Sequence, residues 1–289
     1  MLDIRLDSVV ERLCPEAPLP IYDVYNTTHY AGGAANVALN IQRMGGQVTL
    51  LTPLTHDAAG TTLMDIFLSA DLAVHTTPCE ATTTKTRVFA DRTMLARIDD
   101  DSILSYEQAE LLTESFARIV DNYDTVVFSD YGKGSMRVCE PMIAHCMDKL
   151  TIVDPKGTNW NKYLGVGYIK ANAAEVRAMG IRAADIVEQY RLHGLIHTNG
   201  VAGYTLHQPN RNALAWPAYS VPAVDPTGAG DSFVAAMAVA LTNDLPLDRA
   251  CQHGAVAGAL ATTHVGTAVI TAEEIEECLP KYLSSITQQ

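Results

Sequence analysis

The sequence lacks the features that define several common classes of protein. No apolar run approaches the roughly 20 residues that a membrane-spanning helix needs, and the first residues lack the apolar core of a signal peptide. The six cysteines are scattered and form no C-x-x-C pair, which favours reduced thiols in the cytoplasm. Internal repeats and low-complexity segments are also absent. We therefore expect a cytoplasmic protein without a membrane partner.

Positive charge is also scarce. The chain has 20 lysines and arginines against 33 aspartates and glutamates, which gives a formal net charge of −13. Nucleic acid and anionic membranes repel such a chain, so neither is expected as a main partner. A ligand that carries phosphate would need a local pocket of positive charge. The hydrophobic fraction of 48% suffices for one large α/β domain or two small ones.

The stretch from Asp225 to Asp231 is rich in proline and glycine and runs into an alanine-rich segment that indicates a buried helix. Gly228 and Gly230 let the backbone approach a ligand, because no Cβ stands in the way. Free N–H groups at the start of the helix would form an anion hole there. Asp231, at the mouth of that hole, would accept a proton from a hydroxyl that attacks phosphorus. The alternative is a glycine-rich turn in which Asp231 only caps the helix.

A second run of small residues opens with Gly32 and Gly33 and predicts a helix that ends at Gly45-Gly46. Small side chains allow close approach of a ligand, and Asn36 would then reach one of its hydroxyl groups. The alternative is a tightly packed helix in which Asn36 is a polar residue of the interior. Taken alone, the pattern favours neither interpretation.

Residues 82–99 alternate threonine with charged and apolar residues around an Asp91-Arg92 turn, which predicts a β-hairpin. Lys85, Arg87 and Arg97 bring three cations together in an otherwise acidic chain. One interpretation is a flap that binds an anionic substrate. The alternative is a solvated face of the hairpin that binds nothing.

The rest of the chain alternates short apolar strands with helical segments, as α/β folds do. Predicted strands at 125–128, 151–153, 167–170 and 195–198 each end in polar or glycine residues. Because open parallel sheets bind ligands at the carboxyl ends of their strands, these ends predict a site. Residues 1–30 show no clear first strand, only a short extended piece at 19–25 between prolines. Further predicted elements are a strand at 47–52, helices at 61–70 and 253–262, and an antiparallel pair at 204–208 and 214–221.

Three landmarks, in this order, resemble the ribokinase-like (PfkB) family of sugar kinases: the Gly32–Asn36 start, Asn172 with Glu175 after the strand predicted at 167–170, and the Asp225–Asp231 loop. The resemblance implies a three-layer α/β/α sandwich with a mostly parallel central sheet and a small β lid. It implies a single domain over residues 1–289, with lid segments at about 12–30 and 76–100. The activity it implies is ATP-dependent phosphorylation of a sugar hydroxyl with Mg²⁺.

The resemblance also implies roles for individual residues. Asp231 would be the base, and Gly228, Ala229 and Gly230 the anion hole. Asn172 and Glu175 would organise Mg²⁺ indirectly, through water and phosphate. The implied nucleotide-binding residues are Asn172, Glu175, Thr198, Gly200, Gly203, Thr227 and His253. The implied substrate-binding residues are Asp3, Gly32, Gly33, Asn36, Lys85, Arg87, Arg97, Asp130 and Lys133.

Several shorter motifs are similar to those of the heptose-phosphate kinases within this family. They are the segments 1–3, 14–20, 32–38, 85–87, 129–134 and 154–157. This likeness implies O1 of D-glycero-β-D-manno-heptose 7-phosphate as the acceptor, in the supply of ADP-heptose for lipopolysaccharide. The basic hairpin suits a sugar that already carries a phosphate. The alternatives are a ribokinase-like kinase for another sugar or nucleoside, and a non-catalytic relative that binds a sugar phosphate.

Two further expectations concern the architecture. The family pattern has a strand immediately before the residues that correspond to Met1–Asp3, so we expect the sheet to lack its first strand. The hairpin has an apolar side that includes Val88, Ala90, Leu95 and Ile98, and its edges invite pairing with another chain. Flaps of this family often pair between subunits, which implies a two-fold homodimer whose interface includes residues 15–25 and 82–99. The alternative is a flap that folds over its own subunit.

Overall fold

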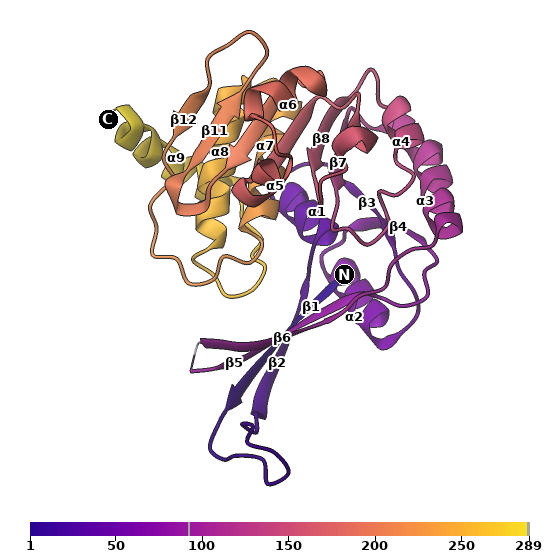
Figure 1. Cartoon of the computed structure of the whole chain (residues 1–289), viewed down its shortest axis with the longest axis vertical. Coiled ribbons are helices and arrows are strands. Elements are labelled where there is room, and N and C mark those ends of the chain that lie inside the picture. The colour runs from indigo at the N-terminus through magenta and orange to yellow at the C-terminus, as the bar shows by residue number, and fades with distance from the viewer. Residues whose placement is uncertain (92, 288–289) are drawn as a thin grey trace.

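A computed structural model describes residues 1–91 and 93–287. The body is an α/β sandwich, and a long β sheet projects from it as a lid (Figure 1). This confirms the predicted fold class. Among the described residues, no helix combines the length and the apolar character needed to cross a membrane.

The central sheet has six strands in the order β12-β11-β10-β9-β8-β7. Its parallel strands are β7 (Thr125–Ser129), β8 (Leu150–Asp154), β9 (Tyr168–Asn172) and β10 (Gly194–Thr198). The antiparallel strands β11 (Tyr204–His207) and β12 (Leu214–Trp216) extend one edge. The four predicted parallel strands are confirmed, whereas β12 is much shorter than predicted. The carboxyl ends of the parallel strands lie along one edge of the body, and the polar and glycine residues noted in the sequence follow these ends.

Helices cover both faces of this sheet, because neighbouring residues of each strand point to opposite sides. Ile152 belongs to the apolar core shared with α7 and α8, and Val153 to the core shared with α3 and α4. The first core involves α1 (Ala34–Arg43), α7 (Ala229–Thr242), α8 (Leu247–Ala261) and α9 (Ala272–Thr287). The second involves α3 (Tyr106–Ile119), α4 (Glu140–Ala144), α5 (Ala173–Ala178) and α6 (Ala183–Gln189). Short 3₁₀ turns lie at Val120–Asn122, Trp160–Tyr163 and Gly200–Ala202.

Two more parallel strands, β3 (Thr49–Pro53) and β4 (Ala73–Thr77), form a separate pair joined by α2 (Ala58–Ser69). Within the described residues β3 forms no ladder with β7, although the Tyr123 hydroxyl beside β7 donates a hydrogen bond to Thr49. The pair β3 and β4 and the parallel strands β7 to β10 therefore belong to two separate sheets. The expected loss of the family's first strand stays a prediction.

The lid is a four-stranded sheet in the order β2-β1-β5-β6. Its strands are β1 (Leu2–Val9), β2 (Asp23–Ala31), β5 (Thr84–Ala90) and β6 (Thr93–Asp100). The predicted hairpin is confirmed as β5 and β6, while Arg92 of its predicted turn lies outside the described residues. The expectation of no strand near the N-terminus is wrong. Leu2, Ile4 and Leu6 alternate with charged residues, a period-two signal that the neighbouring prolines obscured.

Several predicted boundaries also need correction. β2 begins and ends later than the predicted extended piece at 19–25. Helix α2 begins before the predicted residue 61, because Asp57 caps it by accepting a hydrogen bond from the Gly60 N–H. Helix α8 begins directly after Pro246, well before the predicted residue 253. Proline fits the position before a helix, since its fixed φ and missing N–H cost little there.

Candidate active site

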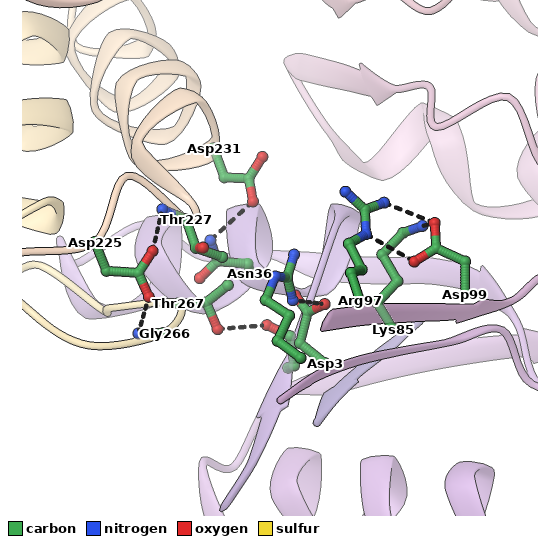
Figure 2. A network of polar contacts seen from close by, with 12 residues as sticks. Asp3, Asn36, Lys85, Arg97, Asp99, Asp225, Thr227, Asp231, Gly266 and Thr267 are labelled. Atoms are coloured by element: carbon green, nitrogen blue, oxygen red, sulfur yellow. Dashed lines mark hydrogen bonds and ion pairs between the residues drawn. The ribbon is translucent and has the colours of Figure 1, made fainter. Parts of the chain in front are cut away.

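Asp231 lies on the first turn of α7 and is only 9% exposed. Two side chains from distant parts of the sequence donate hydrogen bonds to its carboxylate. Asn36 on α1 donates from Nδ2 to Oδ2 at 2.9 Å (Figure 2), and the Tyr131 hydroxyl donates to Oδ1 at 2.5 Å. The sequence analysis named Asn36 but missed Tyr131. The structure thus brings α1, α7 and the loop after β7 together at one carboxylate.

Burial raises the pKa of Asp231 to about 6, even though the hydrogen bonds from Asn36 and Tyr131 favour its charged form. The nearby carboxylate of Asp154 raises this pKa further, and the ammonium of Lys170 lowers it. Burial, together with the charge of Asp231, raises the pKa of Tyr131 well above its usual range. At neutral pH the pair therefore consists of an ionised carboxylate and a neutral phenol. A carboxylate of this kind can accept a proton.

The loop before α7 has a fixed shape. Gly228 adopts a left-handed φ of 79°, and a Cβ there would come within 2.8 Å of Asn36 Nδ2. Asp225 braces the loop by accepting hydrogen bonds from the backbone N–H groups of Thr227 at 2.9 Å and Gly266 at 3.0 Å (Figure 2). These contacts hold the N-terminus of α7 in place, as the anion-hole hypothesis requires.

A buried lysine lies beneath this loop. Lys170 on β9 is 5% exposed and pairs with Asp154 at 3.0 Å. A Cβ on Gly230 would meet Lys170 Nζ at 2.8 Å, so the ammonium lies against the turn that carries Asp231. Burial alone would lower the pKa of Lys170, but Asp154 holds it above its usual value. The sequence holds one usable signal for this residue, because a lysine inside an apolar strand, two positions before Asn172, needs a partner for its buried charge.

Three arginines form a row across the lid. The register pairs Arg5 with Arg87 across β1 and β5, and Arg87 with Arg97 across β5 and β6. Residues paired in this way have side chains on the same face of a sheet. The sequence analysis missed Arg5, because no strand was expected there. Its guanidinium stacks on the Phe89 ring at 3.7 Å from the ring centre.

Among the described residues of the lid strands, Arg5, Lys85, Arg87 and Arg97 each already have a carboxylate partner in the chain. Asp3 pairs with Arg87 at 2.8 Å. Asp99 pairs with both Lys85 at 2.8 Å and Arg97 at 2.7 Å (Figure 2). These contacts hold the pKa of Asp99 well below its usual range, because Arg97 and Lys85 donate hydrogen bonds to it. The predicted cluster of Lys85, Arg87 and Arg97 therefore exists as a network of ion pairs.

The two glycines at the start of α1 make room for neighbouring side chains, Gly32 for Asp3 of the lid network and Gly33 for Tyr131. A Cβ on Gly32 would overlap the carboxylate of Asp3. A Cβ on Gly33 would meet the Tyr131 ring at 3.1 Å, and Gly33 has a φ of 63° that side chains disfavour. Gly32 and Gly33 thus allow the side chains of Asp3 and Tyr131 to lie close to the backbone at the start of α1.

A cleft separates the lid from the loop before α7. It is lined by Asp3, Ile4, Arg5, Tyr30, Arg87, Phe89, Asp225, Thr227, Gly266 and Thr267. Thr227, which the resemblance implied on the nucleotide side, therefore faces the same cleft as Arg87. Tyr30 also lines this cleft, although no pattern in the sequence pointed to that residue.

Asp130 and Lys133 lie in the loop that carries Tyr131. Asp130 is 5% exposed and accepts hydrogen bonds from the Gly132 N–H at 2.6 Å, Lys162 at 2.6 Å and the Tyr163 hydroxyl at 2.5 Å. These contacts are those of a residue that shapes the loop. Lys133 pairs with Asp101, next to the lid network. Substrate contact by Asp130 and Lys133 stays a prediction.

Asn172 and Glu175 form a capping box at the start of α5. Asn172 Oδ1 accepts hydrogen bonds from the N–H groups of Ala174 and Glu175, and Glu175 Oε2 accepts one from the Asn172 N–H. Glu175 Oε1 lies 3.6 Å from Lys156 Nζ. No cluster of three or more metal-ligating side chains occurs in the described part of the chain. The donors present fit a Mg²⁺ ion held mainly through water and phosphate, and do not fit a cage of protein ligands.

The remaining predicted nucleotide-binding residues lie in two places. Thr198 ends β10, and Gly200 and Gly203 flank the 3₁₀ turn that follows it. Gly203 has a φ of 95° and lies against the backbone of Trp216, so the loop passes tightly beneath β12. His253 lies on α8 and contacts Glu276 on α9 at 3.3 Å. In the described part of the chain, no hydrogen bond or ion pair joins His253 to the loop at 198–203.

The chain matches the pfkB family of carbohydrate kinases over residues 2–274. It is 33% identical over 290 residues to the bifunctional protein HldE of Methylococcus capsulatus, which covers 95% of this chain and 61% of that protein. It is 30% identical over 294 residues to the bifunctional protein HldE of Haemophilus ducreyi, which covers 96% of this chain and 62% of that protein. The chain thus spans less than two thirds of the length of these relatives.

Solved structures show the same fold at lower sequence identity. Phosphofructokinase-2 from Escherichia coli superimposes with a TM-score of 0.81 at 20% identity, covering 98% of this chain and 97% of that one. Ribokinase from Thermotoga maritima gives a TM-score of 0.76 at 20% identity, covering 96% of each chain. Because the family match extends over nearly the whole sequence and the fold agrees with it, the chain belongs to the pfkB family of carbohydrate kinases and is a phosphotransferase that acts on a sugar hydroxyl.

Proposed function

We propose that the chain transfers the γ-phosphate of ATP to O1 of D-glycero-β-D-manno-heptose 7-phosphate. The catalytic part of this proposal rests on Asp231, a buried carboxylate at the N-terminus of α7. Its pKa of about 6 leaves it ionised, and able to accept a proton, at neutral pH. The family match supports a sugar kinase. The heptose rests on the motif likeness of segments 14–20, 129–134 and 154–157, together with the cationic lid.

The transfer step follows from the geometry of Asp231. The acceptor hydroxyl gives its proton to the Asp231 carboxylate as its oxygen bonds to the γ-phosphorus. The bond between that phosphorus and the bridging oxygen of ADP breaks, and ADP leaves with the electron pair. The N–H groups of Gly228 and Gly230 would face the charge that develops on the transferred group, and the Ala229 N–H, which donates to the Pro226 carbonyl oxygen at 3.3 Å, would exchange that long bond for the same charge. Lys170, against Gly230, adds a fixed positive charge behind them.

The nucleotide would bind along the carboxyl ends of the parallel strands, as ligands of open α/β sheets do. Thr198, Gly200 and Gly203 would line its site, with His253 on the far side. Mg²⁺ would be held near Asn172 and Glu175 and would neutralise phosphate charge when bound. The carboxylate of Glu175 faces Lys156 in the chain alone, so this lysine is a further candidate for phosphate contact.

The lid would bind the phosphate that the sugar already carries. Arg5, Arg87 and Arg97 lie in a row on one face, and Arg5 and Arg87 line the cleft beside Thr227. A phosphate dianion attracts guanidinium groups more strongly than single carboxylates do, because it offers more charge and a matching bidentate geometry. The sugar phosphate would therefore replace Asp3 and Asp99 as partner of these arginines.

A coupled assay of ADP release tests this function directly. The panel comprises heptose 7-phosphate, fructose 6-phosphate, ribose, adenosine and unphosphorylated heptose, each with ATP and Mg²⁺. We expect the highest kcat/KM for the phosphorylated heptose. A higher value for another sugar or a nucleoside would reassign the substrate. Binding of sugar phosphates by calorimetry without any ADP release would instead support a non-catalytic relative.

Replacement of the base tests the mechanism. Asp231→Asn keeps the size of the side chain but removes the proton acceptor. We expect turnover to fall by roughly 100-fold or more, within the range for loss of a general base. Asp185→Asn on the exposed start of α6 is a matched control that should keep its activity. Normal turnover of purified Asp231→Asn protein would contradict the proposed role.

A further inference from the structure

We propose that Tyr131 is a positioning residue for the candidate base, and that its hydroxyl keeps Asp231 oriented and ionised. This inference rests on the proposed function for its catalytic meaning. Its physical content, a hydrogen bond that favours the charged form of one carboxylate, stands on the geometry of the pair.

The geometry fixes the direction of the hydrogen bond. The Tyr131 hydroxyl lies 2.5 Å from Asp231 Oδ1, and a carboxylate can only accept. Charge-assisted hydrogen bonds from a hydroxyl to a carboxylate are short, as this one is. Asn36 binds the other carboxylate oxygen at 2.9 Å, so each oxygen has one donor from the chain. The plane of the carboxylate is therefore fixed on both sides before any substrate binds.

Both carboxylate oxygens remain able to accept a further proton. An ionised carboxylate offers about four lone-pair positions, and the two side chains occupy one on each oxygen. The remaining positions are free to face a substrate hydroxyl. Tyr131 thus orients the base without blocking it.

The hydroxyl of Tyr131 also opposes the effect of burial. Burial favours the neutral acid, whereas the donors Asn36 and Tyr131 favour the carboxylate. Two other charged groups face Asp231: Asp154 on β8 disfavours its charge, and Lys170 on β9 favours it. Tyr131 itself stays protonated, because burial and the charge of Asp231 both raise its pKa. It is therefore a permanent donor across the working pH range.

Tyr131→Phe removes this donor and keeps the aromatic ring that packs against Gly33. In a plot of kcat/KM against pH, the apparent pKa of the acid limb should rise by about one pH unit, because one charge-assisted hydrogen bond to the carboxylate is lost. Activity at neutral pH should then fall, and most of it should return at high pH. A merely structural role would lower activity equally at every pH.

Tyr163→Phe is a matched control. Its hydroxyl also donates a 2.5 Å hydrogen bond to a buried aspartate, but to Asp130 instead of Asp231. We expect the acid limb of this variant to coincide with that of the unmodified chain. If both variants moved the limb alike, the effect would come from the loop as a whole, and the assignment to Tyr131 would be wrong.

A second measurement is independent of turnover. In protein labelled with ¹³C at aspartate carboxyls, the Asp231 signal is identified by its loss in Asp231→Asn. Its titration midpoint should lie near 6 in the unmodified chain and about one pH unit higher in Tyr131→Phe. An unchanged midpoint would overturn the inference, whatever the substrate is. If the midpoint moves but Asp231→Asn retains full turnover, Tyr131 tunes Asp231 and the proposed catalytic role fails.

Discussion

Asp231 combines the candidate chemistry with a cost in stability. In the unfolded chain its pKa would have the ordinary value of 3.8, whereas in the folded chain burial raises it to about 6. The folded state therefore binds the proton more tightly, and the stability of the fold decreases as the pH rises from about 3.8 to about 6. Above that range the protein bears the full penalty of a buried charge.

Asp231→Asn should consequently raise stability at neutral pH, although it lowers turnover by roughly 100-fold or more. A pKa that rises from 3.8 to about 6 corresponds to roughly 3 kcal/mol, as an upper bound, because each pKa unit is 1.36 kcal/mol. Urea denaturation at pH 7.5 should show a gain, and the gain should shrink at pH 5, where Asp231 is mostly protonated. An equal effect at both pH values would mean that the charge of Asp231 is not its cause.

Replacement of Arg87 tests whether the lid binds an anionic substrate. Arg87→Ala should raise the KM for a phosphorylated sugar by roughly 10-fold or more, because a charge-assisted contact is lost. The KM for ATP should change little. Arg182→Ala, which breaks an exposed ion pair with Asp185, is the control for loss of one positive charge. Equal increases in the two KM values would argue against a phosphate site on the lid.

At the scale of elements, the contact between α7 and α8 fixes the position of the anion hole. Glycine in α8 lets the two helices approach closely. A Cβ on Gly258 would lie 2.9 Å from the carbonyl oxygen of Ala229, which belongs to the first turn of α7. A Cβ on Gly254 would lie 2.8 Å from the Phe233 ring and 2.9 Å from the Phe233 carbonyl oxygen, one turn further along α7. The two glycines thus contact α7 at different distances from the candidate chemistry.

Gly258→Ala should therefore lower turnover more than Gly254→Ala does. Both changes overpack the helix contact at about 1–3 kcal/mol, and the better helix propensity of alanine offsets about 1 kcal/mol. Only Gly258→Ala pushes on the backbone that carries the anion hole, where a displacement near 1 Å costs roughly 100-fold in rate. Thermal unfolding and kcat measured on both variants separate the two effects. Similar kcat values would show that the first turn of α7 tolerates the shift.

At the scale of the whole molecule, the projecting lid suggests a second subunit. Exposed apolar side chains on it include Leu95, at 44% exposure, and Ile98, at 58%. Val88, which the sequence suggested for the same surface, is only 5% exposed and already packs within the chain. Its expected role at an interface is therefore wrong, and replacing it would test folding instead of assembly. The homodimer itself stays a proposal.

Light scattering at micromolar concentration should give the mass of a dimer. Ile98→Lys should produce a monomer with a raised KM for the sugar phosphate, because pairing of lids would order the arginines over the cleft. Leu164→Lys replaces another exposed apolar residue, at 57% exposure and outside the lid, and should remain dimeric. An unmodified chain that is monomeric and fully active would rule out the proposed assembly.

The sequence by itself determined the elements whose signals are local. The parallel strands β7 to β10 follow from short apolar runs, and the loop from Asp225 to Asp231 follows from the chemistry of glycine and proline. The hairpin of β5 and β6 follows from its period of two. These patterns need only near neighbours in the chain, so composition and spacing reveal them.

Only the tertiary structure decided which side chains meet. Tyr131 reaches Asp231 across 100 positions of sequence, and Asn36 reaches it across 195. Lys170 comes under the anion loop, and Arg5 joins the arginine row, only because of strand order and register. No local pattern encodes such contacts, since the faces that meet depend on how the sheet and helices pack. The orientation and the pKa of Asp231 are therefore properties of the fold, although the sequence alone pointed to the residue.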